Sequence, residues 1–249
     1  MKTNIEIKAI GAVVAIMMAA SACSKGNDDL TSPEYVSLLD VAEEGVTTIR
    51  NSDLPYILSD SLSFSENEKE MLLHMKEEEK LARDVYSALF AKWGSSVFSR
   101  ISAAENNHMN SVILLLGSIG EEYTIAEEPG FFSDSAFGDL YNTLVEKGSA
   151  SLGEAYTVGA LIEDLDIKDL GNYLNETDNG NIILVFGNLQ KGSRNHMRAF
   201  TRQLSYLGLT YTPSYISQEE YDSIISTPIE SGKFYQVNGR GKHGRRNGW

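Results

Sequence analysis

Composition and charge narrow the chemistry of this chain before any motif is considered. The 249 residues carry 35 acidic and 21 basic side chains, giving a formal net charge of −14. An acidic surface repels phosphates, so nucleic acid is not expected as a partner. Cys23 is the single cysteine, which excludes an internal disulfide, a zinc ribbon and a rubredoxin-type iron centre.

Residues 1–22 have the organisation of a signal peptide. A short, mostly basic start precedes an apolar run over 9–22, which is shorter than the roughly 20 residues that cross a bilayer. The run ends in the sequence ASAC, which resembles a bacterial lipobox. This resemblance implies that Cys23 is lipidated and anchors the chain to a membrane of the cell envelope, on the periplasmic face or at the cell surface. The alternative is an ordinary signal peptide followed by an unmodified cysteine.

Residues 23–62 are predicted to form a tether and an N-terminal extension. The stretch SKGNDD resembles the acidic tether that follows the lipidated cysteine in Bacteroidetes-type lipoproteins. Short apolar groups over 35–60 follow no sustained period, which indicates a segment draped over the folded domain.

Helical patterns dominate from Ser65 onward. Two capping-box patterns, Ser65 with Glu68 and Ser151 with Glu154, predict helix starts, and glycines mark several ends. The predicted long helices cover 65–93, 96–118, 151–174 and 181–207, and shorter ones cover 135–147 and 217–226.

The long connection between the second and third long helices predicts the topology. A crossover of about 30 residues is what a ferritin-like four-helix bundle requires. The sequence therefore predicts an all-α fold with this bundle over 63–210. Residues 211–249 are predicted to form a C-terminal extension with a disordered basic tail.

Each long helix carries an apolar stripe, at steps of three and four residues, that is interrupted near its middle by polar residues. The stripes, in chain order, are Leu72, Met75, Glu79, Ala82, Tyr86 and Leu89; Phe98, Ile101, Glu105, His108, Val112 and Leu115; Leu152, Tyr156, Gly159, Glu163, Asp166, Leu170 and Tyr173; and Ile182, Phe186, Leu189, Ser193, His196, Phe200 and Leu207.

The interrupting residues predict a metal site. An unpaired buried carboxylate costs several kcal/mol, so four would exceed the net stability of a typical domain unless they were protonated, paired or bound to cations. No Lys or Arg lies on the stripes. Four carboxylates balance two divalent ions, and two neutral imidazoles complete a shell suited to iron or manganese. The candidate ligands are Glu79, Glu105, His108, Glu163, Asp166 and His196.

Three motifs resemble the helices of rubrerythrin-like proteins. The stretch EKLARDVY, which begins at Glu79, has the Glu-x-x-Ala-x-x-x-Tyr spacing of their first helix. Glu105-x-x-His108 matches their second helix, and one helical turn brings its two side chains to the same face. Glu163-x-x-Asp166 looks like the paired acidic positions of their third helix.

With GALIEDLDIKDL and GSRNHMRAF, these motifs resemble an uncharacterised ferritin-like domain family over roughly 63–210. The resemblance implies a di-iron carboxylate fold. Its implied roles are terminal or bridging carboxylates for Glu79 and Glu163, a bridge for Glu105, imidazole ligands for His108 and His196, and a labile ligand for Asp166.

Ser193 departs from the family pattern. Ferritin-like di-iron proteins usually place a Glu one turn before the histidine of the fourth helix, whereas this chain has Ser193-x-x-His196. A hydroxyl is a poor iron ligand, so one bridging carboxylate is missing. Asp166 is the candidate replacement; otherwise the site holds one metal, a different metal or none.

Each candidate ligand also has a structural interpretation. Under this interpretation, Glu79 pairs with Arg83, and Glu163 pairs with Arg194 or Arg198. Glu105 and His108 bond to each other or to Arg100. Asp166 is a surface residue, and His196 bonds to a tyrosine hydroxyl. Glu77 and Glu78 lie off the stripe and are predicted to be solvated. No role is expected for His74 or His243.

The leading functional hypothesis is a di-iron or mixed di-metal oxidoreductase that acts on peroxide or dioxygen. It needs an external electron donor, because the chain has no rubredoxin-like cysteines of its own. The alternatives are metal sequestration without turnover and a non-catalytic envelope lipoprotein that uses the bundle for binding or scaffolding. A homo-oligomer is compatible with each hypothesis.

Overall fold

The computed structural model describes residues 34–42, 45–58, 63–119 and 126–237, and this part of the chain is predominantly helical. The predicted all-α class is thereby confirmed. The predicted signal peptide, Cys23, the tether that follows it up to residue 33 and the basic tail (residues 238–249) lie outside the described residues. Within the described ranges, no helix combines the length and the hydropathy that crossing a bilayer requires.

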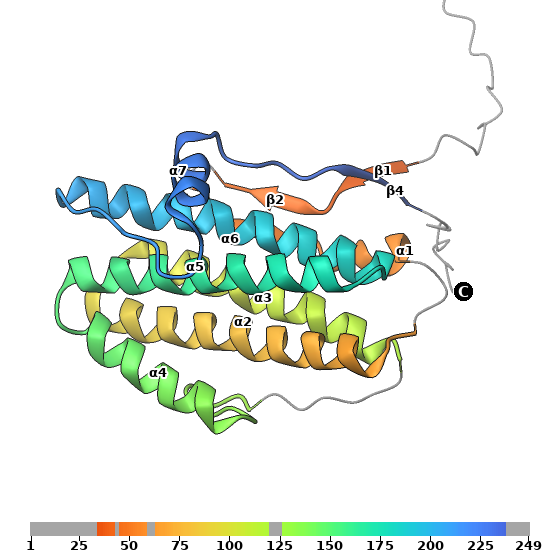
Figure 1. The fold of residues 1–249 in the computed structure, drawn as a ribbon, viewed down its shortest axis with the longest axis horizontal. Helices are drawn as coiled ribbons and strands as arrows, with labels where there is room; N and C mark the ends of the chain where they lie inside the picture. Colours follow the sequence, from red (N-terminus) through yellow and green to blue (C-terminus); the bar gives the residue numbers. More distant parts are fainter. Residues whose placement is uncertain (1–33, 43–44, 59–62, 120–125, 238–249) are drawn as a thin grey trace, which may run out of the picture. The chain divides into compact units, whose positions relative to one another are not determined.

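Four long helices lie side by side (Figure 1). Helix α2 (Glu66–Trp93) pairs with α3 (Ser96–Gly117), and α5 (Leu152–Glu176) pairs with α6 (Gly180–Tyr206). The two pairs meet through contacts of α2 with α5 and of α3 with α6. Each helix begins and ends within two residues of its predicted bounds.

Local hydrogen bonds explain these boundaries. At the start of α2, the Glu68 amide donates to Ser65 Oγ at 3.2 Å, and the Ser65 amide donates to Glu68 Oε2 at 2.8 Å, which completes the predicted capping box. Gly94 ends α2 in the left-handed conformation, with φ of 66°. Ser151 accepts a hydrogen bond from the Glu154 amide at the start of α5.

Shorter helices cover parts of the long ones. Helix α4 (Ser135–Gly148) packs on α2 and α5, and α7 (Gln218–Ser226) packs on α6. Figure 1 shows α4 along the side of α2 that faces away from α6. The face of α2 beneath α4 is therefore shielded from solvent.

The N-terminal extension forms short elements on the helices. Strands β1 (Glu34–Ser37) and β4 (Phe234–Val237) pair antiparallel, as do β2 (Leu39–Val41) and β3 (Thr47–Ile49), and α1 (Leu54–Ile57) follows. Strand β3 contacts both α3 and α6. The predicted draped segment is thus an ordered hairpin, which we call the β2–β3 hairpin (residues 39–49, of which 43–44 are not described).

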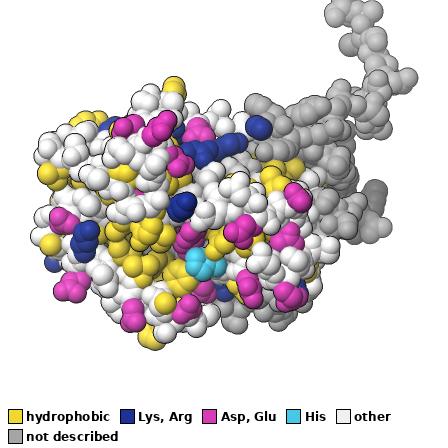
Figure 2. Space-filling view, viewed as in Figure 1, with side chains coloured by type: hydrophobic (Ala, Val, Ile, Leu, Met, Phe, Trp, Pro, Cys, Tyr) yellow, Lys and Arg dark blue, Asp and Glu magenta, His cyan; other side chains and the backbone are white. Residues whose placement is uncertain are grey.

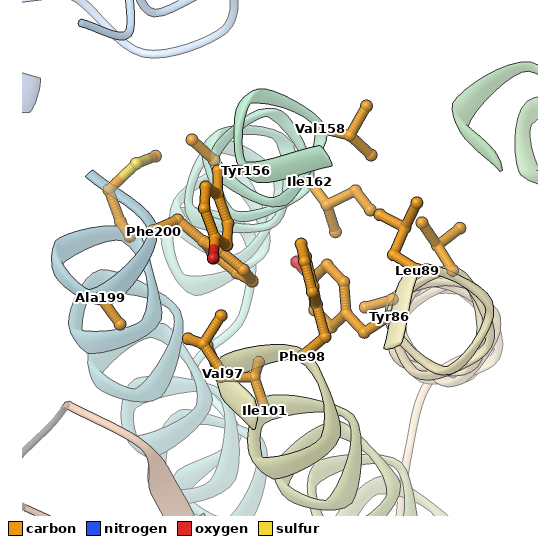
Figure 3. Close-up of a cluster of buried hydrophobic side chains, with 14 of the residues drawn as sticks. Tyr86, Leu89, Val97, Phe98, Ile101, Tyr156, Val158, Ile162, Ala199 and Phe200 are labelled. Atoms are coloured by element: carbon orange, nitrogen blue, oxygen red, sulfur yellow. The ribbon is translucent and has the colours of Figure 1, made fainter. Parts of the chain in front are cut away.

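Apolar side chains form two separate clusters, one toward each end of the long helices. One contains Tyr86, Phe98, Tyr156 and Phe200, whose rings lie together between the helices (Figure 3). The other contains Leu72, Leu115, Leu170 and Phe186. Along α2, α3 and α6, the residues between the clusters include the polar interruptions of the predicted stripes. At the end of the fourth stripe, Leu207 is 47% exposed, so its predicted core position is wrong.

Candidate metal centre

Five of the six predicted ligands converge in the polar layer between the two apolar clusters. Glu79 comes from α2, Glu105 and His108 from α3, Glu163 from α5 and His196 from α6, and none is more than 3% exposed. The helical periodicity places them there, because each lies on its helix's inward stripe.

Glu105 lies at the middle of this group. Its Oε2 is 2.8 Å from His108 Nδ1, and its Oε1 is 2.8 Å from His196 Nδ1. Glu79 Oε2 is 3.5 Å from His108 Nδ1, and Glu163 Oε2 is 3.7 Å from His196 Nδ1. The two imidazole rings stack at 5.4 Å between centroids.

Several of these atoms are close to one another without being hydrogen-bonded. His108 Nδ1, His196 Nδ1, Glu79 Oε1 and Glu105 Oε1 are all buried, and none has a hydrogen-bond partner of acceptable geometry. Buried polar atoms in folded proteins are nearly always paired. Oxygen and nitrogen atoms that point at one another unpaired are the donor set that a divalent transition metal takes, so these residues fit such an ion.

The backbone of Thr47 fixes the two histidines in different ways. His108 Nε2 is 2.9 Å from the Thr47 carbonyl, which only accepts, so Nε2 carries the proton and a neutral ring keeps a free lone pair on Nδ1. The Thr47 amide donates to His196 Nε2 at 3.1 Å, so a neutral His196 ring carries its proton on Nδ1. Burial lowers the pKa of His108, but Glu105 and Glu79 raise it well above its usual value, so a metal at Nδ1 displaces a proton from either ring; only His108 offers Nδ1 in its neutral form.

Asp166 is held at the edge of the centre by Ser193. Ser193 Oγ donates a hydrogen bond to Asp166 Oδ2, across the contact between α5 and α6. Ser193, which stands where a Glu was expected, thus binds Asp166, the carboxylate predicted to replace that Glu. Asp166 also lines a small cavity with Glu78, Glu79, Glu105 and Glu163.

Burial and neighbouring charges shift the pKa values of the centre's carboxyl groups, upward for Glu79 and Glu163 and downward for Glu105. Desolvation raises the pKa of Glu79 to about 8 and that of Glu163 to about 7, with the Glu105 charge adding to both. Burial also acts on Glu105, but the two histidines outweigh it and lower its pKa well below the usual range. Without a metal, Glu105 is the carboxylate that carries the negative charge.

His196 experiences two opposing effects. Burial disfavours its charged form, yet Glu105 and Glu163 raise its pKa to about 9. The amide of Thr47 acts against protonation, because it donates to the nitrogen that the second proton would occupy. Because the Thr47 amide faces Nε2, a single proton on His196 lies at Nδ1, toward Glu105 and Glu163.

Second-layer contacts orient the ligands. Tyr86, on the first stripe, donates its hydroxyl to Glu163 Oε1 at 2.7 Å. Gly192 lies against the His108 ring: a Cβ at that position would be 2.7 Å from His108 Cε1, so only glycine leaves room for the imidazole. Neither role has a signal in the sequence beyond the residue types themselves.

The arginines that the structural interpretation assigned to the centre bond elsewhere. Arg83 contacts Asp84 and Asn106, while Arg194 and Arg198 both pair with Glu230. None of these contacts, nor those that Arg100 makes with Ser96, involves a carboxylate of the centre. The neighbours of His196 are Glu105, Glu163 and Thr47 rather than a tyrosine hydroxyl.

The predicted solvation of Glu77 and Glu78 is wrong. They are 8% and 6% exposed, because α4 and α5 cover this side of α2. Glu77 pairs with Lys76 at 3.0 Å and accepts a hydrogen bond from the Ser133 amide. Glu78 faces His74 and Asp169, a group that the stripe pattern did not anticipate.

The fold and this centre define a helical protein with a buried group of glutamates and histidines that can hold a metal ion. A family model of an uncharacterized protein domain, DUF2202, matches residues 68–228. The chain belongs to this family.

A relative is known in an archaeon. Uncharacterized protein MJ0754 of Methanocaldococcus jannaschii is 52% identical over 173 residues, which cover 68% of this chain and 91% of that protein. The crystal structure of hypothetical protein MJ0754 from Methanococcus jannaschii matches with a TM-score of 0.68 at 50% identity, and the match covers 69% of this chain and 99% of that one.

Proposed function

We propose that this protein is a metal-binding, ferritin-like lipoprotein whose centre holds iron or a mixed pair of metals. The observation that carries the proposal is the convergence of buried, unpaired oxygen and nitrogen atoms from four helices. The ferritin-like assignment is supported by the four long helices, by the long connection between α3 and α5, and by the Glu105-x-x-His108 motif.

The residues of the chain have distinct roles in this proposal. Glu105 bridges the site, Glu79 and Glu163 add carboxylates, and His108 supplies the imidazole that offers Nδ1 in its neutral form. His196 becomes a ligand only when it loses its Nδ1 proton. The apolar clusters on both sides exclude water, which strengthens every charge interaction in between.

Iron bound there would supply redox chemistry toward peroxide or dioxygen. Turnover then requires an electron donor from outside, because the single cysteine of the chain leaves no rubredoxin-type centre. Cys23 anchors the protein to a membrane of the cell envelope through its lipid.

Metal sequestration without turnover is a second candidate. It is favoured by Ser193, which stands where a carboxylate would complete a di-iron site and which binds Asp166 instead. Fewer bridging carboxylates favour one metal over two.

Metal analysis of the full chain, purified from cells in detergent, tests the proposal. We expect about one equivalent or more of a transition metal, and a loss of affinity of about 10- to 100-fold or more in Glu105→Ala. Glu70→Ala, which removes an exposed glutamate from α2, is the control and should retain the metal. A wild-type protein that binds no transition metal would leave the non-catalytic envelope lipoprotein as the better description.

Peroxide consumption then separates the two candidates. The iron-loaded protein with an added reductant should consume peroxide if it is an oxidoreductase, and Glu105→Ala should not. Tight iron binding without peroxide or dioxygen consumption would support sequestration.

A further inference from the structure

A second group of metal-ligand side chains lies beside the candidate centre. His74 and Glu78 from α2 and Asp169 from α5 each offer a ligand atom, and these atoms lie within 4.8 Å of one another. The His74 side chain is 42% exposed, whereas that of Glu78 is 6% exposed, so the group extends from the surface inward. Figure 2 shows a histidine exposed beside acidic side chains, and of the described histidines only His74 is accessible.

Glu78 is the member of this group that points to a ligand. Its Oε2 is buried and has no hydrogen-bond partner. His74 Nδ1 lies 3.6 Å away, which is too far for a hydrogen bond. Asp169 brings a second carboxyl group rather than a basic partner, and burial disfavours the charged form of Glu78 and raises its pKa to about 7. A cation among the three side chains would remove this cost.

His74 has one competing contact. Its Nδ1 is 2.9 Å from the hydroxyl of Tyr173. A cation that binds this nitrogen must break that hydrogen bond, so Tyr173 competes with the metal rather than supporting it.

Glu78 also reaches the candidate centre. It lines the small cavity that is bounded by Glu79, Glu105, Glu163 and Asp166. Glu78 therefore belongs both to the group with His74 and Asp169 and to the wall of this cavity.

We propose that His74, Glu78 and Asp169 form a second divalent-cation site, through which the metal passes to the buried centre. Two carboxylates and one imidazole suit Mn²⁺, Fe²⁺ or Zn²⁺. The binding half of this proposal is independent of the proposed function, whereas the uptake half rests on it.

Binding of Mn²⁺ to the metal-free full chain in detergent tests both halves, followed by the loss of the paramagnetic resonance signal of free Mn²⁺. We expect two classes of site in the wild type. Asp169→Asn should remove the outer class and slow filling of the inner one at least about tenfold. Glu105→Gln should remove the inner class alone, and Asp139→Asn, an exposed residue on α4, should change nothing.

The variants also separate structural loss from ligand loss. Tyr173→Phe removes the contact of His74 Nδ1 but no ligand, so it should bind Mn²⁺ at least as tightly as the wild type, whereas His74→Ala should lose the outer class. If Tyr173→Phe loses the outer class as His74→Ala does, the group is a structural network and the proposal is overturned.

The failure of this proposal is distinct from that of the proposed function. If Glu105→Gln abolishes all Mn²⁺ binding and Asp169→Asn binds and fills like the wild type, the second site does not exist while the centre does. If Glu105→Gln leaves Mn²⁺ binding unchanged and Asp169→Asn removes it, the outer site stands, and both the buried centre and the uptake route are overturned.

Discussion

The two histidines of the candidate centre share Glu105 as a neighbour, but their neutral rings carry the free lone pair on different nitrogens. The backbone of one residue, Thr47, accepts from His108 through its carbonyl and donates to His196 through its amide. Both contacts use backbone atoms, so they depend on where β3 lies rather than on the threonine side chain.

This difference predicts unequal effects of removing each imidazole. His108→Ala should lower metal affinity by about 10- to 100-fold or more, and His196→Ala should lower it less, because only His108 has a free Nδ1 lone pair in its neutral form. Equilibrium competition with a chelator measures both affinities.

Thr47→Ser is the control, since it keeps the hydroxyl and both backbone contacts and should bind metal nearly as well as the wild type. Equal losses in His108→Ala and His196→Ala would show that the Thr47 amide does not hold His196 in the proposed tautomer.

At the scale of elements, the β2–β3 hairpin packs on α3 and α6 and contacts both histidines of the centre. Besides the two histidine contacts, the Ile49 amide donates to Asn107 Oδ1 on α3, and Asn195 Nδ2 on α6 donates to Thr47 Oγ1. Thr47 lies outside residues 68–228, the part that matches the family model. The matched part of the chain thus contains the candidate ligands, and a segment before it contacts two of them.

The hairpin depends on Gly45. This residue has φ of 90°, and a Cβ there would be 2.8 Å from the carbonyl oxygen of Asn195. Gly45→Ala should therefore destabilise the protein by roughly 1–2 kcal/mol from the backbone conformation, with the clash adding to it.

The same substitution should also speed release of the bound metal, because it moves the Thr47 backbone, which contacts both histidines. Thermal unfolding and chelator-induced metal loss measure the two effects. Gly187→Ala in α6, where a Cβ meets no atom within 4 Å, is the control and should be neutral or stabilising. Metal release that is unchanged in Gly45→Ala would mean that the hairpin does not orient the site.

At the scale of the whole molecule, the buried acidic layer makes stability depend on pH. Glu79 and Glu163 have pKa values of about 8 and about 7 in the folded protein, above the ordinary value of 4.5. Between about pH 4.5 and pH 8 the folded state holds protons on Glu79 and Glu163 that the unfolded chain releases. The contribution of these two groups to stability is therefore full below about pH 4.5 and is lost as pH rises toward 8.

The melting temperature of the metal-free protein should therefore fall as pH rises from about 5 to 8, and metal binding should tighten over the same range, because metal displaces those protons. Thermal unfolding with and without metal at several pH values measures this. Glu79→Gln, which mimics the protonated form, should weaken the dependence. A metal-free melting temperature that rises across this range would contradict the assigned protonation.

The sequence by itself determined the helices and the inward position of five ligands. Caps such as Ser65 with Glu68, and apolar steps of three and four residues, act within one or two turns, so they are readable without a fold. The same periodicity located Glu79, Glu105, His108, Glu163 and His196, because a residue on an apolar stripe turns inward with it.

Only the tertiary structure decided what those side chains meet. Glu77 and Glu78 are buried because α4 and α5 cover a face that α2 alone presents to solvent. The contact of Thr47 with His196 joins residues 149 positions apart, and Ser193 meets Asp166 across two helices. Hydrogen-bond partners and tautomers depend on such distant neighbours, and no local pattern specifies them.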